Sequence, residues 1–184
     1  MSLPKLRAAS RLMYRNKKIM DFNVKKLIYY AYFHSHVTYL CPIWGLAKQD
    51  LMSKVKVLQN GIIKNMIKVN RRYSTIQVYT QTKITPIDVL VRVYLSLLIY
   101  EHLSGRKLLN TVLVLNSQIH VYTTRARNDL AVPNVNTTHY GLHSVLYQAI
   151  TNYNALPTRV KEIQEYRKFK KEVKNFYHSV YCNL

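Results

Sequence analysis

The sequence predicts a mainly α protein: a helical bundle, then a small α+β segment with short strands and two C-terminal helices. Apolar residues recur at steps of three and four over most of the chain, which is the spacing of one helix face. From 106 to about 140, β-branched residues, Asn and Thr replace that period. With 48% hydrophobic residues, 4 Gly and 5 Pro, the 184-residue chain can build a core and differs from a disordered basic tail.

Two helices are expected before residue 70. The first spans 23–39, stops before Pro42, and should bury one apolar stripe: Val24, Leu27, Ile28, Ala31 and Tyr32. The second begins at Asp50, which can serve as its N-cap, and is weakened modestly by Gly61. Its apolar residues also share one side: Leu51, Val55, Leu58, Ile62 and Met66.

Two further helices complete the first region, which we place at residues 1–105. A short one is expected over 74–81. The string Thr85-Pro86-Ile87-Asp88 then combines a capping Thr, a Pro at the first helical position and a carboxylate near the positive end of the helix dipole. This helix should run to Leu103 and stop at Gly105.

The second region, 106–184, should begin with extended chain. Residues 111–115 and 129–132 are the strand candidates. Helical spacing resumes over 142–156 and again over 166–181. The last helix should bury one apolar stripe: Phe169, Val173 and Phe176.

The charge of the chain is large and uneven. The formal net charge is +20; residues 1–92 hold 17 Lys and Arg against 3 acids, and residues 93–184 hold 11 against 5. Within the first 26 residues, eight basic residues are opposed by Asp21 alone. Such a field attracts polyanions, so nucleic-acid backbone binding is favoured over a merely solvated basic surface.

Several other classes of protein fit the sequence poorly. The longest uncharged apolar stretch, 93–100, is far shorter than the ~20 residues that cross a bilayer. Attachment to a membrane surface ranks below nucleic acid, because the segment after Lys25 is apolar nearly all round. The N-terminal residues do not form an ordinary secretory signal, so an intracellular protein, nuclear or cytoplasmic, is expected.

Metal and cofactor chemistry finds no support in the sequence. The two cysteines, Cys41 and Cys182, are too few for a zinc cluster or a disulfide framework. The acidic residues do not supply the several converging carboxylates of a two-metal polymerase or nuclease. His34 and His36 would point about 200° apart on a helix. We therefore assign no metal, no cofactor and no catalytic residue.

A set of short strings suggests a family. They are Phe33-His34-Ser35-His36-Val37-Thr38-Tyr39 with Ile43-Trp44-Gly45, Val57-Leu58-Gln59-Asn60, Tyr122-Thr123-Thr124-Arg125, Val132-Pro133, Tyr140-Gly141, Tyr153-Asn154-Ala155-Leu156-Pro157 and Phe169-Lys170. In this order they resemble the C-terminal region of reverse transcriptases from jockey-like non-LTR retrotransposons, beyond the polymerase palm. The resemblance extends from about residue 20 to 180.

The resemblance implies a thumb-like helical bundle and a following linker. In the parent RNA-directed DNA polymerase this part grips the primer-template duplex and the element RNA. The family's catalytic pair of adjacent aspartates is missing, since no Asp-Asp occurs in the chain, and the sequence begins too late to contain the fingers and palm. The implied protein is a nucleic-acid-binding piece of the enzyme that is inactive alone. Its expected partners are the RNA or DNA backbone, including a primer-template duplex, and the missing palm.

Candidate contact residues lie in the basic N-terminal segment and in two connecting segments that lie off the apolar stripes. They are Lys17, Lys18, Lys25, Lys26, Arg71, Arg72, Tyr73, Tyr122, Arg125 and Arg127. Tyrosine can stack on bases, and Arg125 and Arg127 would point the same way along an extended strand. The other prominent tyrosines are expected to pack in the core: Tyr29, Tyr32, Tyr94 and Tyr147.

Two other hypotheses remain open from the sequence. The chain could be a domesticated helical protein-interaction module that presents an apolar surface where the palm once packed. It could also be a non-functional retroelement remnant. Base specificity, a preference for RNA or DNA, and the oligomeric state are not encoded in any motif that we can identify.

Overall fold

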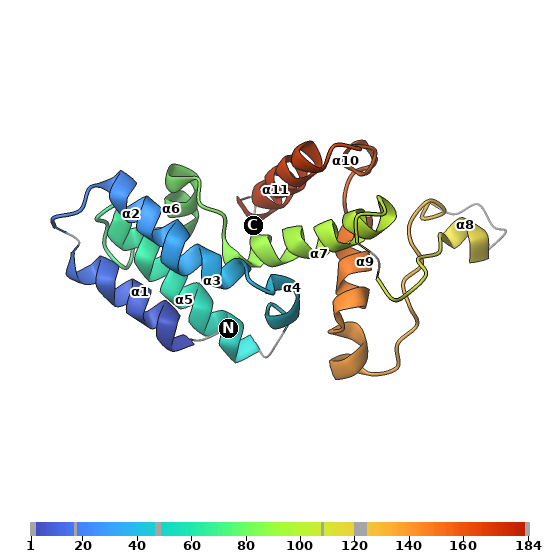
Figure 1. Ribbon diagram of the computed structural model, residues 1–184, viewed down its shortest axis with the longest axis horizontal. Coiled ribbons are helices and arrows are strands. Elements are labelled where there is room, and N and C mark those ends of the chain that lie inside the picture. Colours follow the sequence, from blue (N-terminus) through green and yellow to red (C-terminus); the bar gives the residue numbers. More distant parts are fainter. Residues whose placement is uncertain (1–2, 17, 47–48, 108, 120–124, 183–184) are drawn as a thin grey trace. The chain divides into compact units, whose positions relative to one another are not determined.

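The computed structural model describes residues 3–16, 18–46, 49–107, 109–119 and 125–182, which are mainly helical, as predicted (Figure 1). The elements up to residue 103 are α1 (Leu3–Arg15), α2 (Phe22–Ile28), the π-helix η1 (Tyr29–His34), α3 (Ser35–Thr38), α4 (Cys41–Trp44), α5 (Gln49–Met66), α6 (Thr75–Thr82) and α7 (Ile87–Leu103). Those after it are α8 (Asn116–Ile119), the π-helix η2 (Thr138–Leu142), α9 (Val145–Asn154), α10 (Thr158–Lys161) and α11 (Tyr166–Cys182).

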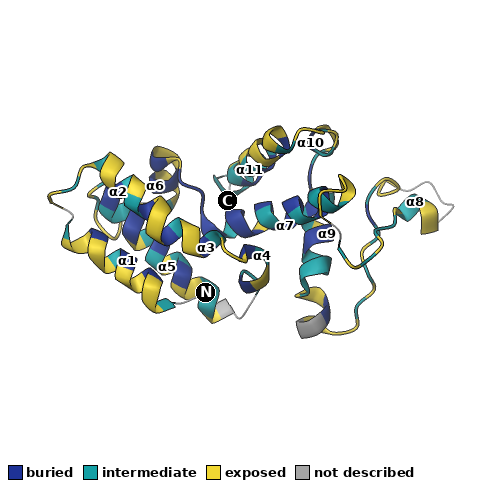
Figure 2. Cartoon of the chain, viewed as in Figure 1, coloured by how far each residue is buried: buried dark blue, intermediate teal, exposed yellow. Residues whose placement is uncertain are grey.

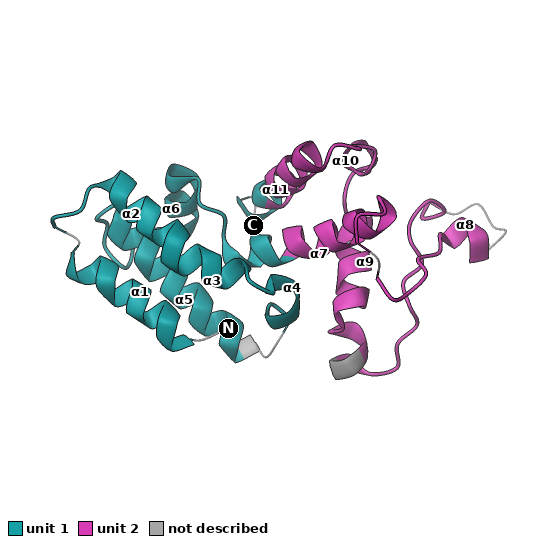
Figure 3. Ribbon diagram, in the orientation of Figure 1, with its two compact units in different colours: residues 1–91, 178–184 teal, residues 92–177 magenta. Residues whose placement is uncertain are grey.

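The chain divides into two compact units (Figure 3). Unit 1 comprises residues 1–91 and 178–184, and unit 2 comprises residues 92–177. The boundary falls inside α7 and again inside α11, so each of these helices contributes residues to both units. Whether the regions expected from the sequence, 1–105 and 106–184, act as separate functional parts stays a prediction.

Helix α1 lies in the basic N-terminal segment, for which no helix was predicted. It buries Leu6, Ala9 and Met13, which recur at steps of three and four, and it packs against α5 (Figures 1 and 2). Its basic side chains all face solvent: Lys5, Arg7, Arg11 and Arg15. The apolar spacing was therefore sufficient to predict this helix.

The helix expected over 23–39 is present as α2, η1 and α3, but it turns a different face inward. The buried residues are Lys25, Tyr29, Phe33 and Val37, while the expected stripe is largely exposed, with Leu27 at 71% and Tyr32 at 56%. In an α-helix, residues four apart drift by about 40° per step. The wider turn of the π-helix reduces that drift, so residues at steps of four stay on one face.

A buried glutamine joins three segments of unit 1 to α5. Gln59 Nε2 donates to the Tyr29 hydroxyl at 2.9 Å and to the Thr85 carbonyl at 3.0 Å. Its Oε1 accepts from the Tyr79 hydroxyl and from the Ile87 N–H, each at 2.9 Å. The predicted start of α7 is thus confirmed to within a residue, and a side chain from α5 satisfies its first N–H.

The starts and ends of the other long helices follow local signals. Helix α5 begins at Gln49, two residues before the Leu51 start that an Asp50 N-cap implies, so Asp50 lies inside its first turn and is not its N-cap. Helix α7 ends at Leu103, and Gly105 follows with a φ of 68°, the left-handed conformation that a glycine stop requires.

In unit 2, aromatic side chains of α11 pack against α7. The rings of Tyr100 and Phe169 stack with their centroids 4.0 Å apart, and the Tyr177 hydroxyl donates to the Asn152 carbonyl at 2.6 Å. Helix α11 begins at the predicted residue. Tyr177 takes the buried place that the sequence analysis gave to Phe176, which is half-buried.

The expected strands are not formed in the part of 106–140 that the structure describes. Residues 111–115 and 129–132 meet in a single bridge, between Leu115 and Leu130. Two hydrogen bonds flank the bridge, from the Asn116 N–H to the Asp129 carbonyl at 2.9 Å and from the Ala131 N–H to the Val114 carbonyl at 2.7 Å. The Leu130 N–H and carbonyl therefore face the opposite edge, where they meet the side chain of Asn154 on α9. Its Oδ1 accepts from the Leu130 N–H at 3.1 Å, and its Nδ2 donates to the Leu130 carbonyl at 2.8 Å. A helix side chain therefore takes the hydrogen bonds that a neighbouring strand would have made.

Candidate functional site

The outer face of α1 is a row of cations. Arg7, Arg11 and Arg15 follow each other at steps of four, which places them about 6 Å apart along the helix axis. No acidic residue occurs between residues 3 and 20. This helix can therefore meet several negative charges of an extended ligand at once.

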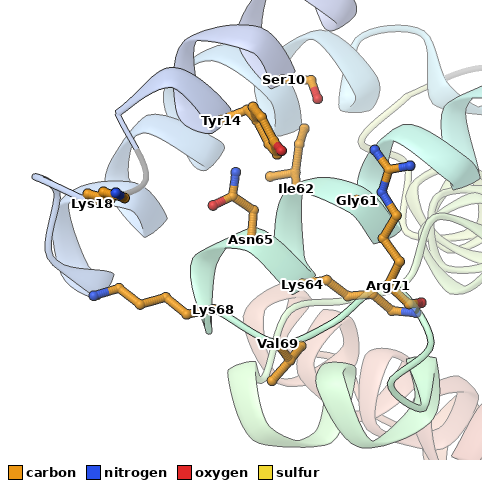
Figure 4. Close-up of a pocket in the computed structure, with 10 residues that line it drawn as sticks. All are labelled: Ser10, Tyr14, Lys18, Gly61, Ile62, Lys64, Asn65, Lys68, Val69 and Arg71. Carbon is orange, nitrogen blue, oxygen red and sulfur yellow. Dashed lines mark hydrogen bonds between the residues drawn. The ribbon is translucent and has the colours of Figure 1, made fainter.

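The row leads to a pocket of about 440 Å³ in unit 1 (Figure 4). Residues from α1, from the following turn, from the C-terminal half of α5 and from the loop after it line the pocket: Ser10, Tyr14, Lys18, Gly61, Ile62, Lys64, Asn65, Lys68, Val69 and Arg71. Four of these are cationic and none is acidic. In the view of Figure 4, Asn65 lies in the middle, with Lys18 and Lys68 on one side and Lys64 and Arg71 on the other. The lining is suited to an anion.

A helix-ending turn positions the cations of this pocket. Lys68 adopts a left-handed conformation with a φ of 58°, its N–H donates to the Asn65 carbonyl at 3.2 Å, and the Val69 N–H donates to the Lys64 carbonyl at 3.1 Å. This is the Schellman arrangement of a helix C-terminus, with lysine where glycine is usual. Lys64 Nζ then donates to the Arg71 carbonyl at 2.8 Å, which fixes the loop beside the helix end.

The structure brings two of the predicted contact residues together. Lys18 and Arg71 are far apart in the sequence, yet both are exposed and both line the pocket. Arg72 is exposed next to Arg71, and the hydroxyl of the half-buried Tyr73 accepts from Gln81 Nε2 at 3.1 Å. Lys17 and Tyr122 lie outside the described residues.

Two predicted contact residues point elsewhere. Lys25 is fully buried, and its Nζ lies 3.5 Å from the Asn65 carbonyl at the C-terminal end of α5. Burial lowers the pKa of Lys25, and the nearby Lys68 lowers it further. Lys26 is half-buried and donates to the Thr82 carbonyl at 3.3 Å. Lys25 is thus part of the packing of α2 against α5, and it does not belong to the exposed surface.

Arg125 and Arg127 lie in unit 2 and are exposed, but not on an extended strand. Residues 125–128 form a turn, which the Asp129 N–H closes by donating to the Ala126 carbonyl at 3.0 Å. The expectation that they lie on an extended strand was therefore wrong, and the alternation that would point their side chains the same way does not apply to a turn. The two cations remain available at the surface as part of a loop.

Sequence reasoning missed the pocket-lining residues on α1 and α5. Tyr14, with 57% of its surface exposed, and Asn65 belong to segments that were examined only for charge or for apolar spacing. Lys64 and Lys68 fall outside the apolar stripe that the sequence predicts for the second helix. The basic residues that cluster at the end of that helix could have indicated an anion site. Their proximity to Lys18, however, depends on the packing of α1 on α5, which the sequence does not show.

Acidic residues elsewhere are held by neighbouring lysines. The pairs are Lys56–Asp88, Lys107–Glu101, Lys161–Asp129 and Lys168–Glu165. None of these four carboxylates belongs to α1 or lines the pocket. In the described residues, no three His, Cys, Asp or Glu side chains gather closely enough to hold a metal ion. None of the helices over these same residues has the length and apolar character to cross a membrane.

Comparison with known proteins yields no relative. The chain matches no known protein family, no curated protein and no solved structure.

Proposed function

We propose that this chain binds the backbone of RNA or DNA through the basic face of unit 1. In this proposal it corresponds to the thumb and linker of a jockey-like reverse transcriptase and does not polymerise alone. The observation that carries the proposal is the row of cations on α1 continuing into a cationic pocket without an intervening acid. The ordered sequence strings support the family, and they are a separate argument from the charge.

Backbone binding has a definite physical signature. Each phosphate that a lysine or arginine neutralises releases condensed counterions, so the logarithm of the binding constant falls by about 0.9 per contact for each tenfold rise in salt. Binding of this kind is insensitive to base sequence. A basic surface that served only solubility would not produce this behaviour.

The experiment measures the affinity for an RNA–DNA duplex over a range of salt concentrations. Replacing Arg7, Arg11, Lys18 and Arg71 with Gln should weaken binding to all sequences alike and flatten the salt slope by roughly 3–4. The matched control removes four exposed charges elsewhere, with Arg159, Arg167, Lys168 and Lys171 changed to Gln. The control should leave most of the slope intact. An affinity of the unaltered chain that stays flat from low to moderate salt would refute the proposal.

The family assignment has its own test, because binding alone does not identify a reverse transcriptase. The genomic reading frame upstream of Met1 should encode a palm with two adjacent aspartates. A chain that extends to include that palm should incorporate nucleotides, and replacing either aspartate should abolish incorporation. An upstream frame without any polymerase motif would leave the chain as a free-standing binding module.

A protein-interaction module is the second candidate, and one observation favours it. The stripe of α2 and η1 that was expected in the core is exposed, with Leu27 at 71% and Val24 at 46%. Apolar side chains at helical spacing on a surface are typical of a covered interface. A partner that stays bound after nuclease treatment and is lost in Leu27→Ser, with nucleic-acid affinity unchanged, would support this candidate.

A further inference from the structure

The pocket of unit 1 combines two kinds of chemistry that a surface for phosphates alone does not need. Its volume of about 440 Å³ falls in the range of small-molecule sites, roughly 300–1,000 Å³. The cations described above form part of the wall. The rest offers an aromatic ring from Tyr14, the side-chain amide of Asn65 and the apolar side chain of the buried Ile62.

These groups match the parts of one nucleotide. Lysine and arginine bind phosphate, a tyrosine ring stacks on a base, and an amide both donates and accepts at the edge of a base. A nucleotide inside a duplex has its faces stacked and its edge paired, so it cannot offer them. An unpaired nucleotide at a bulge, loop or strand end can.

We propose that this pocket holds a single unpaired nucleotide of a bound RNA or DNA, with its base against Tyr14 and Asn65 and its phosphate between Lys18 and Lys68. The inference rests on the proposed function, because it assumes that the α1 row engages the backbone on either side. It adds a preference for structured or frayed nucleic acid over a blunt duplex. An acidic peptide would use the cations but gain nothing from the ring and the amide.

Gly61 provides a way to close the pocket without changing its charge. It lies on α5 in the wall of the pocket, and a Cβ added there meets no atom within 4 Å. Gly61→Leu should therefore fold and fill part of the space, because leucine is also a better helix former than glycine. Ser53→Leu is the matched control, since Ser53 is an exposed residue of the same helix that does not line the pocket.

The test compares a blunt RNA–DNA duplex with the same duplex carrying one bulged 2-aminopurine. The unaltered chain should bind the bulged form about tenfold more tightly and quench its fluorescence through stacking. Gly61→Leu should bind the bulged and the blunt duplex with equal affinity and give no quenching, while Ser53→Leu should keep both effects. Tyr14→Leu should lose the quenching as well, and thermal melting of each variant verifies that it folds.

The outcomes separate this inference from the proposed function. Equal affinity for both duplexes without quenching would overturn the nucleotide pocket and leave backbone binding intact. A tenfold preference that survives in Gly61→Leu would also overturn it, because the bulge would then bind elsewhere. Failure to bind either duplex would refute the proposed function itself. Displacement of the bulged duplex by an acidic peptide but not by a single-stranded oligonucleotide would assign the pocket to a protein ligand.

Discussion

Replacing Gln59 with Leu should destabilise unit 1 more than any single surface change. The side chain is fully buried and makes hydrogen bonds to partners in three other segments. Leucine has a similar volume but no polar atoms, so the main effect is the loss of those bonds and not a cavity. The Thr85 carbonyl, the Ile87 N–H and the Tyr29 hydroxyl would each lose their bond to this residue.

The magnitude follows from the number of groups affected. A buried polar group left without a partner costs about 1–3 kcal/mol. The Tyr79 hydroxyl keeps a second acceptor, Asn60 Oδ1 at 2.6 Å, so we count only three groups in full. The free energy of unfolding should therefore fall by roughly 3–9 kcal/mol. That is a large part of the 5–15 kcal/mol, roughly, that stabilises an ordinary domain.

Urea unfolding followed by far-ultraviolet circular dichroism measures this change. Gln77→Leu is the control, since Gln77 is exposed on α6 and its replacement should change the free energy by no more than about 0.5 kcal/mol. Tyr79→Phe should cost about 1 kcal/mol and should be less than additive with Gln59→Leu, because the two residues share a bond. A Gln59→Leu variant within about 1 kcal/mol of the unaltered protein would refute the reasoning.

Three other changes have definite expected outcomes. Gly61→Ala should raise the free energy of unfolding by up to about 1 kcal/mol, because alanine is the better helix former and its Cβ meets nothing; a lower urea midpoint would contradict this. Lys68→Gly should keep the end of α5 and stabilise it by up to about 1 kcal/mol, because glycine adopts a φ of 58° without strain; a shortened helix would show that lysine is needed there. Burial raises the pKa of the Cys41 thiol from 9.0 to about 12, so stability should fall as the pH rises from 9 toward 12, since the unfolded thiol ionises while the folded one does not. Cys41→Val should reduce that slope, and a thiol reagent should label Cys182 faster than Cys41 in the native protein; equal rates would contradict the burial.

The helices that the sequence predicts well are those whose ends carry local signals. Helix α7 has a proline near its start and a glycine after its end, and α11 has an apolar stripe over its whole length, so their bounds are nearly as predicted. The inward face of 22–38 could not be predicted in the same way. A regular 3.6-residue period favoured Val24 and Leu27, whereas the π-helix shifts the phase toward Tyr29 and Phe33.

The prediction of the strands and the prediction of the site both depended on contacts between distant parts of the chain. Local sequence patterns do not contain those contacts. The β-branched residues around Leu130 favour extended structure, but the group that binds the outer edge of Leu130 is the side chain of Asn154 in a helix, which no local pattern connects to them. Similarly, the sequence marks Lys18 and Arg71 as basic, but only the packing of α1 on α5 places them around one pocket. Lys25 was misjudged because a lysine side chain can be buried where its Nζ reaches a carbonyl at the end of a helix.

The hydrogen bonds of Gln59 also define the shortest fragment of unit 1 that retains all of them. They reach back to Tyr29 and forward to Ile87, so the shortest segment that contains every partner runs from 29 to 87. A fragment that lacks either end of this segment would leave part of the buried Gln59 amide without a hydrogen-bond partner. A deletion inside this interval that removes a partner of Gln59 therefore leaves a buried polar group without its hydrogen bond, even where the rest of the unit is retained.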